Sequence, residues 1–396
     1  MHLVFATSIV PDGVPRSGYE IANAAILDAL RRAGCRISVM GFAWKGRKEQ
    51  GTGGREIGGD TVVLGELDPR TEAAGGLVKL GWLAKAMIRG MTFSSAKMLL
   101  ASPAQVRAAL DALGPVDGVI FNSVQFAGAF RQIFADKPTV YVAHNVEHLS
   151  AEQSAAAARG IVARFMFRRE ARLLKALEEK LCAQARFIYT LSEEDRQVLG
   201  VADDDRSAVL PLVAHAPSAH TAGPRESVYD AALIGTWSWA PNRIGLDWFL
   251  EQVVPHLPQD FRIAVAGDAP ERLAQTHPRV AFVGRVPDAV AFVRSGKVVP
   301  LISRAGTGVQ LKTIETFELG LPSVATPSAL RGISHKPDNC TIADEPRDFA
   351  AALVRAARTP VDLDGREFHE AQRNALDSAV RRGLHEAGFA RRNEAA

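Results

Sequence analysis

Short apolar runs alternate with helix-like segments along the first half of the chain. Residues 3–6 are apolar, apolar residues then recur at helical spacing from Ile21 to Leu30, and residues 37–40 form a second, mostly apolar run. This order predicts a strand, a helix and a second strand, which together make a βαβ unit of a parallel sheet. Further patterns predict strands at 118–121, 139–143 and 187–191 and a long helix at 161–183.

The same alternation restarts in the second half of the chain. The segment at 221–225, Thr-Ala-Gly-Pro-Arg, has the composition of a linker. Beyond it, apolar runs predict strands at 231–234, 262–266, 280–283, 298–301 and 323–325, and helical spacing predicts helices at 243–253 and 309–319.

These two runs of elements predict two doubly wound α/β domains in tandem. We place the first domain at residues 1–220 and the second at 226–363. The charged tail at 364–396 has helical spacing, so it either packs back across the domains or forms a solvated helix. Ligands of doubly wound domains bind at the carboxyl ends of the strands, and the cleft between the domains is therefore the expected site.

The composition limits the kinds of binding partner and the cellular location that we expect. Of the 396 residues 47% are hydrophobic, and the formal net charge of +3 gives no field that would attract nucleic acid, so we expect no nucleic-acid partner. Cys35, Cys182 and Cys340 lie far apart, which argues against a disulfide framework and a zinc site. No apolar run reaches the roughly 18 residues that span a bilayer, and the N-terminus lacks the pattern of a signal peptide. We therefore expect a cytoplasmic protein, peripheral at most at the inner face of the cell membrane.

The segment at 303–326 carries the most specific chemistry. Gly306, Thr307, Gly308 and Val309 join a predicted strand to a predicted helix, and the free amides at a helix start bind anions. Lys312 follows within the helix, and Glu315 lies three residues later on the same face, where a carboxylate can accept hydrogen bonds from a ribose diol. This order favours a nucleoside diphosphate. The alternative is a glycine-rich turn followed by an amphipathic helix with surface charges.

The segment resembles the donor-binding region of family-4-type glycosyltransferases, in which glycines precede a lysine, a glutamate and then G-x-P-V-V-A-T. Other stretches match the same family in order: H-N-x-E at 144–147, T-x-S-E-x-D at 190–195, and W-x-P-N at 239–242 in the opening of the donor domain. The chain thus resembles the subgroup with W-x-P-N and G-x-x-L-K-x-x-E. The resemblance implies the α/β GT-B fold, two Rossmann-like doubly wound domains facing a central cleft, with the acceptor domain first.

The resemblance also implies roles for individual residues. It makes Glu315 the ribose-binding residue, puts Lys312 at the diphosphate as a catalytic group, and places His144 at the reacting sugar. The remaining donor-side residues are Gly306, Thr307, Gly308, Val309, Gly235, Asn242 and Arg243, and the acceptor-side residues are Gly13, Gly18, Asn145 and Glu147. His144 has an alternative role as a residue that only caps its loop, and Gly13 and Gly18 have one as a turn before a helix.

The implied reaction is metal-independent hexosyl transfer with retention, from a nucleoside diphosphate sugar to a glycan or lipid-linked acceptor in cell-surface polysaccharide or glycolipid synthesis. Two departures keep other activities open. Thr307 stands where the family usually has a second glutamate, and Thr236 and Asn242 stand near the places of an arginine and a lysine. The alternatives are a non-catalytic nucleotide-sugar-binding or partner protein of the same fold and a sugar-nucleotide epimerase.

An acidic run invites comparison with a metal site. Asp203, Asp204 and Asp205 lie in a polar loop, away from any strand end that would carry a donor pocket. We interpret them as a solvated turn, and we predict no metal and no other cofactor.

The region at 75–100 is basic and amphipathic. No acidic residue occurs from Ala73 to Leu110. On a helical wheel one face is apolar and the other basic; the apolar face contains Leu77, Leu80, Ala84, Met87, Ile88 and Met91, and the other contains Lys79, Trp82, Lys85 and Arg89. Such a helix either binds an anionic membrane surface or docks on its own domain by the apolar face.

Overall fold

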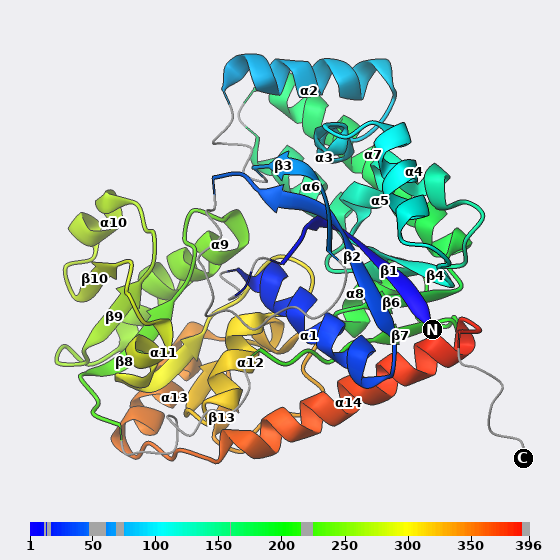
Figure 1. Cartoon of the computed structure of the whole chain (residues 1–396). Coiled ribbons are helices and arrows are strands. Elements are labelled where there is room, and N and C mark those ends of the chain that lie inside the picture. The colour runs from blue at the N-terminus through cyan, green and yellow to red at the C-terminus, as the bar shows by residue number, and fades with distance from the viewer. Residues whose placement is uncertain are drawn as a thin grey trace, which may run out of the picture. The chain divides into compact units, whose positions relative to one another are not determined.

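The computed structural model describes residues 1–11, 13, 17–46, 61–68, 75–158, 160–214 and 225–389. The chain forms two compact units, labelled by element in Figure 1. Unit 1 contains Met1–Leu210 together with Ala375–Ala396, and unit 2 contains Pro211–Asn374. The linker predicted at 221–225 lies outside the described residues, except for Arg225.

Unit 1 is built on a seven-stranded parallel sheet with the order β3-β2-β1-β4-β5-β6-β7. The order reverses between β1 and β4, because the chain builds outward from β1 in both directions. The strands are β1 (His2–Ile9), β2 (Arg36–Trp44), β3 (Thr61–Leu67), β4 (Gly118–Asn122), β5 (Thr139–Ala143), β6 (Phe187–Thr190) and β7 (Ser207–Val209).

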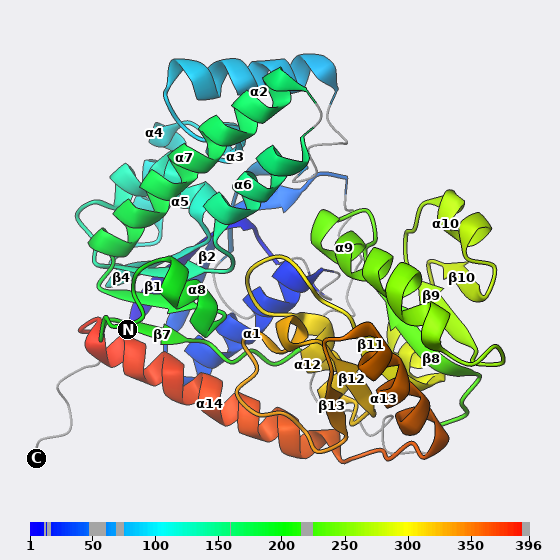
Figure 2. The same cartoon turned by 180° about the vertical axis from the view of Figure 1, so that it is seen from behind.

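Helices cover both faces of this sheet (Figures 1 and 2). They are α1 (Gly18–Arg32), α2 (Gly76–Ile88), α3 (Phe93–Met98), α4 (Pro103–Ala112), α5 (Val124–Phe130), η1 (Arg131–Phe134), α6 (Glu147–Ala157), α7 (Ile161–Gln184) and α8 (Glu193–Val198). Several begin at a capping side chain; the Ser17 hydroxyl, for example, accepts from the Glu20 amide at the start of α1.

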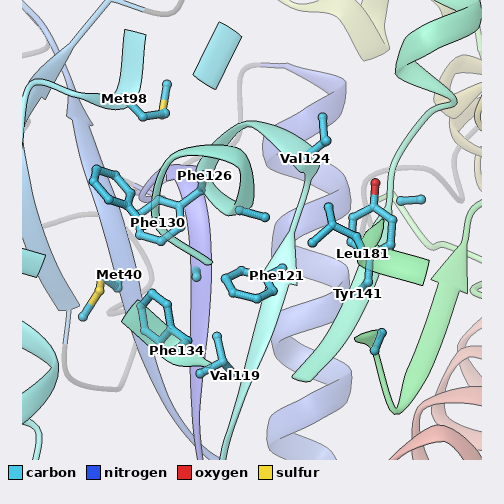
Figure 3. Packing of buried hydrophobic residues seen from close by; sticks show 14 of the residues in the cluster. Met40, Met98, Val119, Phe121, Val124, Phe126, Phe130, Phe134, Tyr141 and Leu181 are labelled. Carbon is cyan, nitrogen blue, oxygen red and sulfur yellow. The ribbon is translucent and has the colours of Figure 1, made fainter. Parts of the chain in front are cut away.

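Aromatic side chains fill the space between this sheet and the helices on one of its faces. Phe126 and Phe130 of α5 point toward Phe121 of β4 and Phe134 of η1 (Figure 3). The rings of Phe121 and Phe134 meet edge to face, with centroids 5.7 Å apart. This core fixes the carboxyl end of β4, from which polar residues of the candidate site project.

Unit 2 repeats the architecture with a six-stranded parallel sheet in the order β10-β9-β8-β11-β12-β13. The strands are β8 (Tyr229–Ile234), β9 (Ile263–Ala266), β10 (Val280–Gly284), β11 (Gly296–Leu301), β12 (Ser323–Ala325) and β13 (Cys340–Ile342). The helices are α9 (Ala240–Trp248), the π-helical η3 (Phe249–Val253), η4 (Val254–His256), α10 (Glu271–Thr276), α11 (Ala289–Arg294), α12 (Leu311–Glu318), η5 (Pro327–Leu330), α13 (Pro346–Arg358) and α14 (Gly365–Glu386).

The charged tail forms α14, which contributes buried residues to both units. In unit 2 the Gln372 amide donates to the carbonyl of Leu212 at 3.3 Å. In unit 1 Asp377 pairs with Arg32 at 2.6 Å, and the Tyr189 hydroxyl donates to the carbonyl of Val380 at 3.0 Å.

Every strand predicted from the sequence is present, but three further strands are not predicted. These are β3, β7 and β13, and each forms an edge of its sheet. The last two are only three residues long, and β3 is largely exposed, so none has the apolar run of a central strand.

The orientation of α2 contradicts one of the two interpretations of residues 75–100. Leu77, Leu80 and Ile88 are 87%, 61% and 85% exposed, whereas Trp82 and Ala86 are buried. The indole of Trp82 packs edge to face against Phe93, and Lys97 lies over its ring at 5.2 Å. The helix therefore docks by the tryptophan-containing face, because this face carries the largest side chain, and the expected docking by the apolar face is wrong. No helix in the described part of the chain is long and apolar enough to cross a bilayer.

Candidate functional site

The glycine turn of unit 2 lies between β11 and α12. Gly306 and Gly308 have φ angles of +94° and +73°, a left-handed backbone that glycine adopts without strain. The backbone of Gln310 is extended, so α12 begins at Leu311, and the helix predicted from 309 is two residues too long at its start. Val309 therefore belongs to the turn, and Lys312 is the second residue of the helix rather than a residue one turn inside it.

Packing holds this turn from two sides. A Cβ atom on Gly306 would lie 3.2 Å from the Cβ of Pro241, the second residue of α9. From the other side, the Arg331 guanidinium donates to the carbonyls of Gly308 and Ala305, both at 3.4 Å. Arg331 follows η5 and has no sequence signal that distinguishes it from a surface arginine. Thr307, between the two glycines, is half-buried.

Lys312 is a half-buried cation beside the turn. Its ammonium group donates to the Asn242 side-chain oxygen at 3.2 Å and lies 5.4 Å from the centroid of the Trp237 ring. Burial lowers its pKa to about 8, and nearby Glu315 acts in the opposite direction. Lys312 therefore remains mostly protonated at pH 7. An anion bound here would interact directly with this half-buried positive charge, in addition to the interaction that the charge already has with the nearby Glu315 carboxylate.

Other predicted donor-side residues surround Lys312. The Asn242 amide group donates to the carbonyl of Thr236 at 3.1 Å, which orients its oxygen toward Lys312. Gly235 follows β8, and a Cβ atom there would approach the Trp237 indole to 3.0 Å. The buried indole donates to the carbonyl of Ala266 at 2.8 Å. Glu315 is half-buried one turn along α12 from Lys312, as predicted.

Two arginines near the turn, the predicted donor-side Arg243 and Arg304, are already paired with carboxylates. Arg243 donates to Asp247 one turn along α9 at 2.6 Å. Arg304 pairs with Asp344 at 2.8 Å and stacks over the Trp248 ring at 4.5 Å. Both charges are partly neutralised, which leaves Lys312 as the better candidate.

In unit 1 the carboxyl ends of β1, β4 and β5 carry a buried polar network. The Asn122 amide nitrogen lies 2.8 Å from Asn23 Oδ1, 3.3 Å from Thr7 Oγ1 and 3.2 Å from the Tyr19 hydroxyl. Its side-chain oxygen lies 2.7 Å from Nε2 of His144, and the Tyr19 and His144 rings pack with centroids 4.9 Å apart. Asn122, Asn23 and Tyr19 were not identified from the sequence, although Asn122 directly follows a predicted strand.

The network determines the protonation of His144. The Asn122 amide nitrogen donates to Asn23 Oδ1, which carries no proton, so the Asn122 oxygen faces the imidazole, and an amide oxygen only accepts hydrogen bonds. Nε2 of His144 therefore carries the proton. Burial lowers the pKa of His144 to about 4, so the ring is neutral at pH 7 and Nδ1 is the acceptor nitrogen.

Glu147 begins α6 instead of lying in a loop. The buried Glu178 carboxylate accepts from the amide of Glu147 at 2.7 Å and from the amide of His148 at 3.3 Å, and it pairs with the His148 ring at 2.6 Å. This caps the helix start, and it gives His148 a structural role. Burial, together with the charge of Glu178, raises the pKa of Glu147 to about 7. Asn145 precedes the helix at the same strand end.

The first βα loop is only partly described. Gly13 has a φ of +123°, and Gly18 is the first residue of α1, after the capping Ser17. Residues 12 and 14–16 of this predicted acceptor-side loop lie outside the described residues.

No part of the described chain brings together three or more His, Cys, Asp or Glu side chains in an arrangement that could hold a metal ion. In the acidic turn Asp203 and Asp205 are exposed, and Asp204 pairs with Arg206 at 2.6 Å.

A family of known proteins matches part of the second unit, and solved structures match the fold of the chain. Residues 230–359 match the family described as Glycosyl transferases group 1, a segment that contains the glycine turn, Lys312 and Glu315. No curated protein matches the sequence.

Three solved structures are similar over nearly the whole chain. Sucrose-phosphate synthase from Thermosynechococcus elongatus is 15% identical with a TM-score of 0.62, and each chain is covered to 98%. WaaG, a glycosyltransferase involved in lipopolysaccharide biosynthesis, is 15% identical with a TM-score of 0.54, covering 96% of this chain and 95% of its own. HepE from Anabaena, solved in complex with UDP, is 14% identical with a TM-score of 0.52, covering 98% and 95%.

At this identity the structural similarity identifies the fold, and the family match covers the second unit. The chain therefore has the GT-B fold of two Rossmann-like domains, and its group 1 domain at residues 230–359 supports a glycosyltransferase.

Proposed function

We propose that this protein transfers a hexosyl group from a nucleoside diphosphate sugar to a glycan or lipid-linked acceptor, with retention and without a metal ion. The observation that carries the proposal is the half-buried Lys312 ammonium beside a left-handed glycine turn, with Glu315 one turn further along α12. The resemblance to the family-4-type subgroup assigns the same residues to the donor. The UDP complex of HepE, which has the same fold, supports a nucleotide donor.

In the proposed reaction the bond from the anomeric carbon to the diphosphate oxygen breaks as the bond to the acceptor oxygen forms. The acceptor attacks from the face that the diphosphate leaves, and a phosphate oxygen takes its proton, so no nucleophilic side chain is needed. Negative charge builds up on the leaving diphosphate. Lys312 and the amides near residues 306–309 stabilise that charge, and because they are held in place before the reaction they lower its barrier.

His144 is the proposed contact to the reacting sugar from unit 1. Its ring is buried, neutral and oriented by Asn122, so it acts through hydrogen bonding and not through charge. In this proposal it accepts a hydrogen bond at Nδ1. Asn122 is then a positioning residue that fixes the tautomer.

The exposed face of α2 supports an acceptor at a membrane surface. Large apolar side chains face outward, and Lys85 and Arg89 on the same helix end are exposed beside them. Exposed apolar surface next to basic residues is typical of proteins that lie on anionic bilayers. We propose that the protein binds the inner face of the cell membrane and acts in cell-surface polysaccharide or glycolipid synthesis, and the role of WaaG in lipopolysaccharide biosynthesis is in keeping with this.

Replacement of Lys312 tests the diphosphate site. Lys312→Ala should lower turnover by about 10- to 150-fold, because a hydrogen bond to a charged group contributes about 1.5–3 kcal/mol. Arg243→Ala and Arg304→Ala should lose less, since both arginines are occupied by carboxylates. Release of nucleoside diphosphate is measured with a panel of nucleotide sugars, with and without EDTA. Loss of turnover on chelation, or a larger defect in Arg243→Ala, contradicts the assignment.

Replacement of His144 tests the contact to the sugar. His144→Ala should reduce kcat by about 10-fold or more, the value of one hydrogen bond in the transition state, with little change in nucleotide affinity. Between pH 5.5 and 8 the wild-type rate should show no step that His144→Ala removes, because the ring is neutral throughout this range. Full turnover in the variant, at an unchanged unfolding midpoint, would leave His144 with a structural role only.

Vesicle co-sedimentation tests the membrane surface. Leu80→Glu/Ile88→Glu should abolish binding to phosphatidylglycerol vesicles, because it places two carboxylates on the exposed apolar face of α2. The matched control is Val63→Glu/Val198→Glu, which alters two exposed apolar residues elsewhere in unit 1. Equal binding of both variants, or no binding of the wild type, contradicts this part of the proposal.

A further inference from the structure

A second helix extends the exposed apolar surface of α2. The first two turns of α7 expose Ile161, Val162 and Phe165, which the sequence did not distinguish from a solvated face. Arg169, in the third turn of α7, donates to the carbonyl of Ala86 at 2.9 Å, so α7 passes the C-terminal end of α2, and the two helices are neighbours in Figures 1 and 2. Two neighbouring helices thus present large apolar side chains to the outside of unit 1.

A cavity opens where α2 ends. It has a volume of about 410 Å³, and it is bounded by the connection from α2 to α3, the C-terminal end of α5 and the middle of α7. Three cationic residues line it, Arg89, Arg131 and Lys180, and none of its lining residues is acidic. Among the described residues these three side chains have neither an ion pair nor a hydrogen bond.

The cavity is also amphipathic. Its three cations share the wall with apolar side chains, including Met91, Leu173 and Leu177. Like charges gathered in one cavity repel each other, and an anion placed among them removes that repulsion. Arginine guanidinium groups suit phosphate oxygens in particular, because their parallel N–H groups match the spacing of two oxygens. The apolar wall suits the glycerol and the first methylene groups of a lipid.

We propose that this cavity binds the phosphate headgroup of an anionic phospholipid, whose acyl chains extend along the exposed side chains of α2 and α7. The proposal rests on the membrane part of the proposed function and adds a defined lipid site to it. The cations at the end of α2 then orient unit 1 on the bilayer, beyond the general attraction of a basic helix.

The test compares two double variants of equal charge. Arg131→Gln/Lys180→Gln removes two cavity cations, and Arg172→Gln/Lys175→Gln removes two exposed cations of α7 that do not line the cavity. Affinity is measured by flotation with phosphatidylcholine vesicles with and without phosphatidylglycerol. The cavity variant should lose about 30-fold in affinity, from roughly fivefold per basic residue at an anionic surface. The loss of affinity in the control variant should be at least several times smaller than this.

A charge-neutral variant keeps the test independent of net charge. Ala176→Phe fills the cavity and should weaken binding to phosphatidylglycerol vesicles without altering the unfolding midpoint. If the two double variants lose vesicle affinity equally, the protein is attracted to the membrane by its charge alone, and the proposed lipid site is wrong. A soluble phosphate is the other possible ligand. It is indicated if glycerol 3-phosphate or inorganic phosphate raises the melting temperature of the wild type but not of Arg131→Gln/Lys180→Gln, while both proteins bind vesicles equally. That result makes the lipid assignment wrong.

Parallel readouts separate this proposal from the proposed function. Nucleoside diphosphate affinity should be the same in the wild type and in all three cavity and control variants, because the donor residues lie in unit 2. If the Leu80→Glu/Ile88→Glu variant loses vesicle binding and the cavity variants keep it, the membrane surface stands and the lipid site is rejected. Absence of any vesicle binding by the wild type rejects both, and sugar transfer remains to be judged by the Lys312 variants alone.

Discussion

Parallel pairing of the strands determines where the polar residues of each unit can gather. All strands of a parallel sheet end at the same edge, and the strand order reverses between β1 and β4 and again between β8 and β11. At the first reversal Asn122 extends from β4, with His144 beyond the neighbouring β5. At the second, Gly235 follows β8 and the glycine turn with Lys312 follows β11. The packing of each core thus places the residues of the candidate site.

Burial lowers the pKa of both proposed catalytic residues but leaves them in different charge states. It lowers the pKa of Lys312 to about 8 and that of His144 to about 4, so at neutral pH the lysine is still charged and the histidine is not. A charged group is suited to a diphosphate, and a neutral ring to a hydroxyl. The same physical effect therefore leaves the two side chains in different charge states, because the ordinary pKa of lysine lies far above 7 and that of histidine lies slightly below it.

The fold and the position of the glycine turn could be predicted from the sequence, because apolar runs and glycines act locally along the chain. Short edge strands lack this signal. Residues whose role arises from contacts distant in the sequence also could not be found: Arg331 lies over the glycine turn, Asn122 orients His144, and Glu178 caps α6 from α7. The docking face of α2 was missed for a related reason, since helical periodicity shows that a helix has an apolar face but not which neighbour Trp82 finds.

The central claim is that the glycine turn, Lys312 and Glu315 bind a nucleoside diphosphate. Calorimetric titration of UDP, GDP and ADP into the wild type, Glu315→Ala and the exposed control Glu251→Ala tests it most directly. One of the nucleotides should bind to the wild type and the control equally, and about 10-fold or more weakly to Glu315→Ala, at an unchanged melting temperature. Equal affinity in all three proteins, or no binding of any nucleoside diphosphate, would contradict the account.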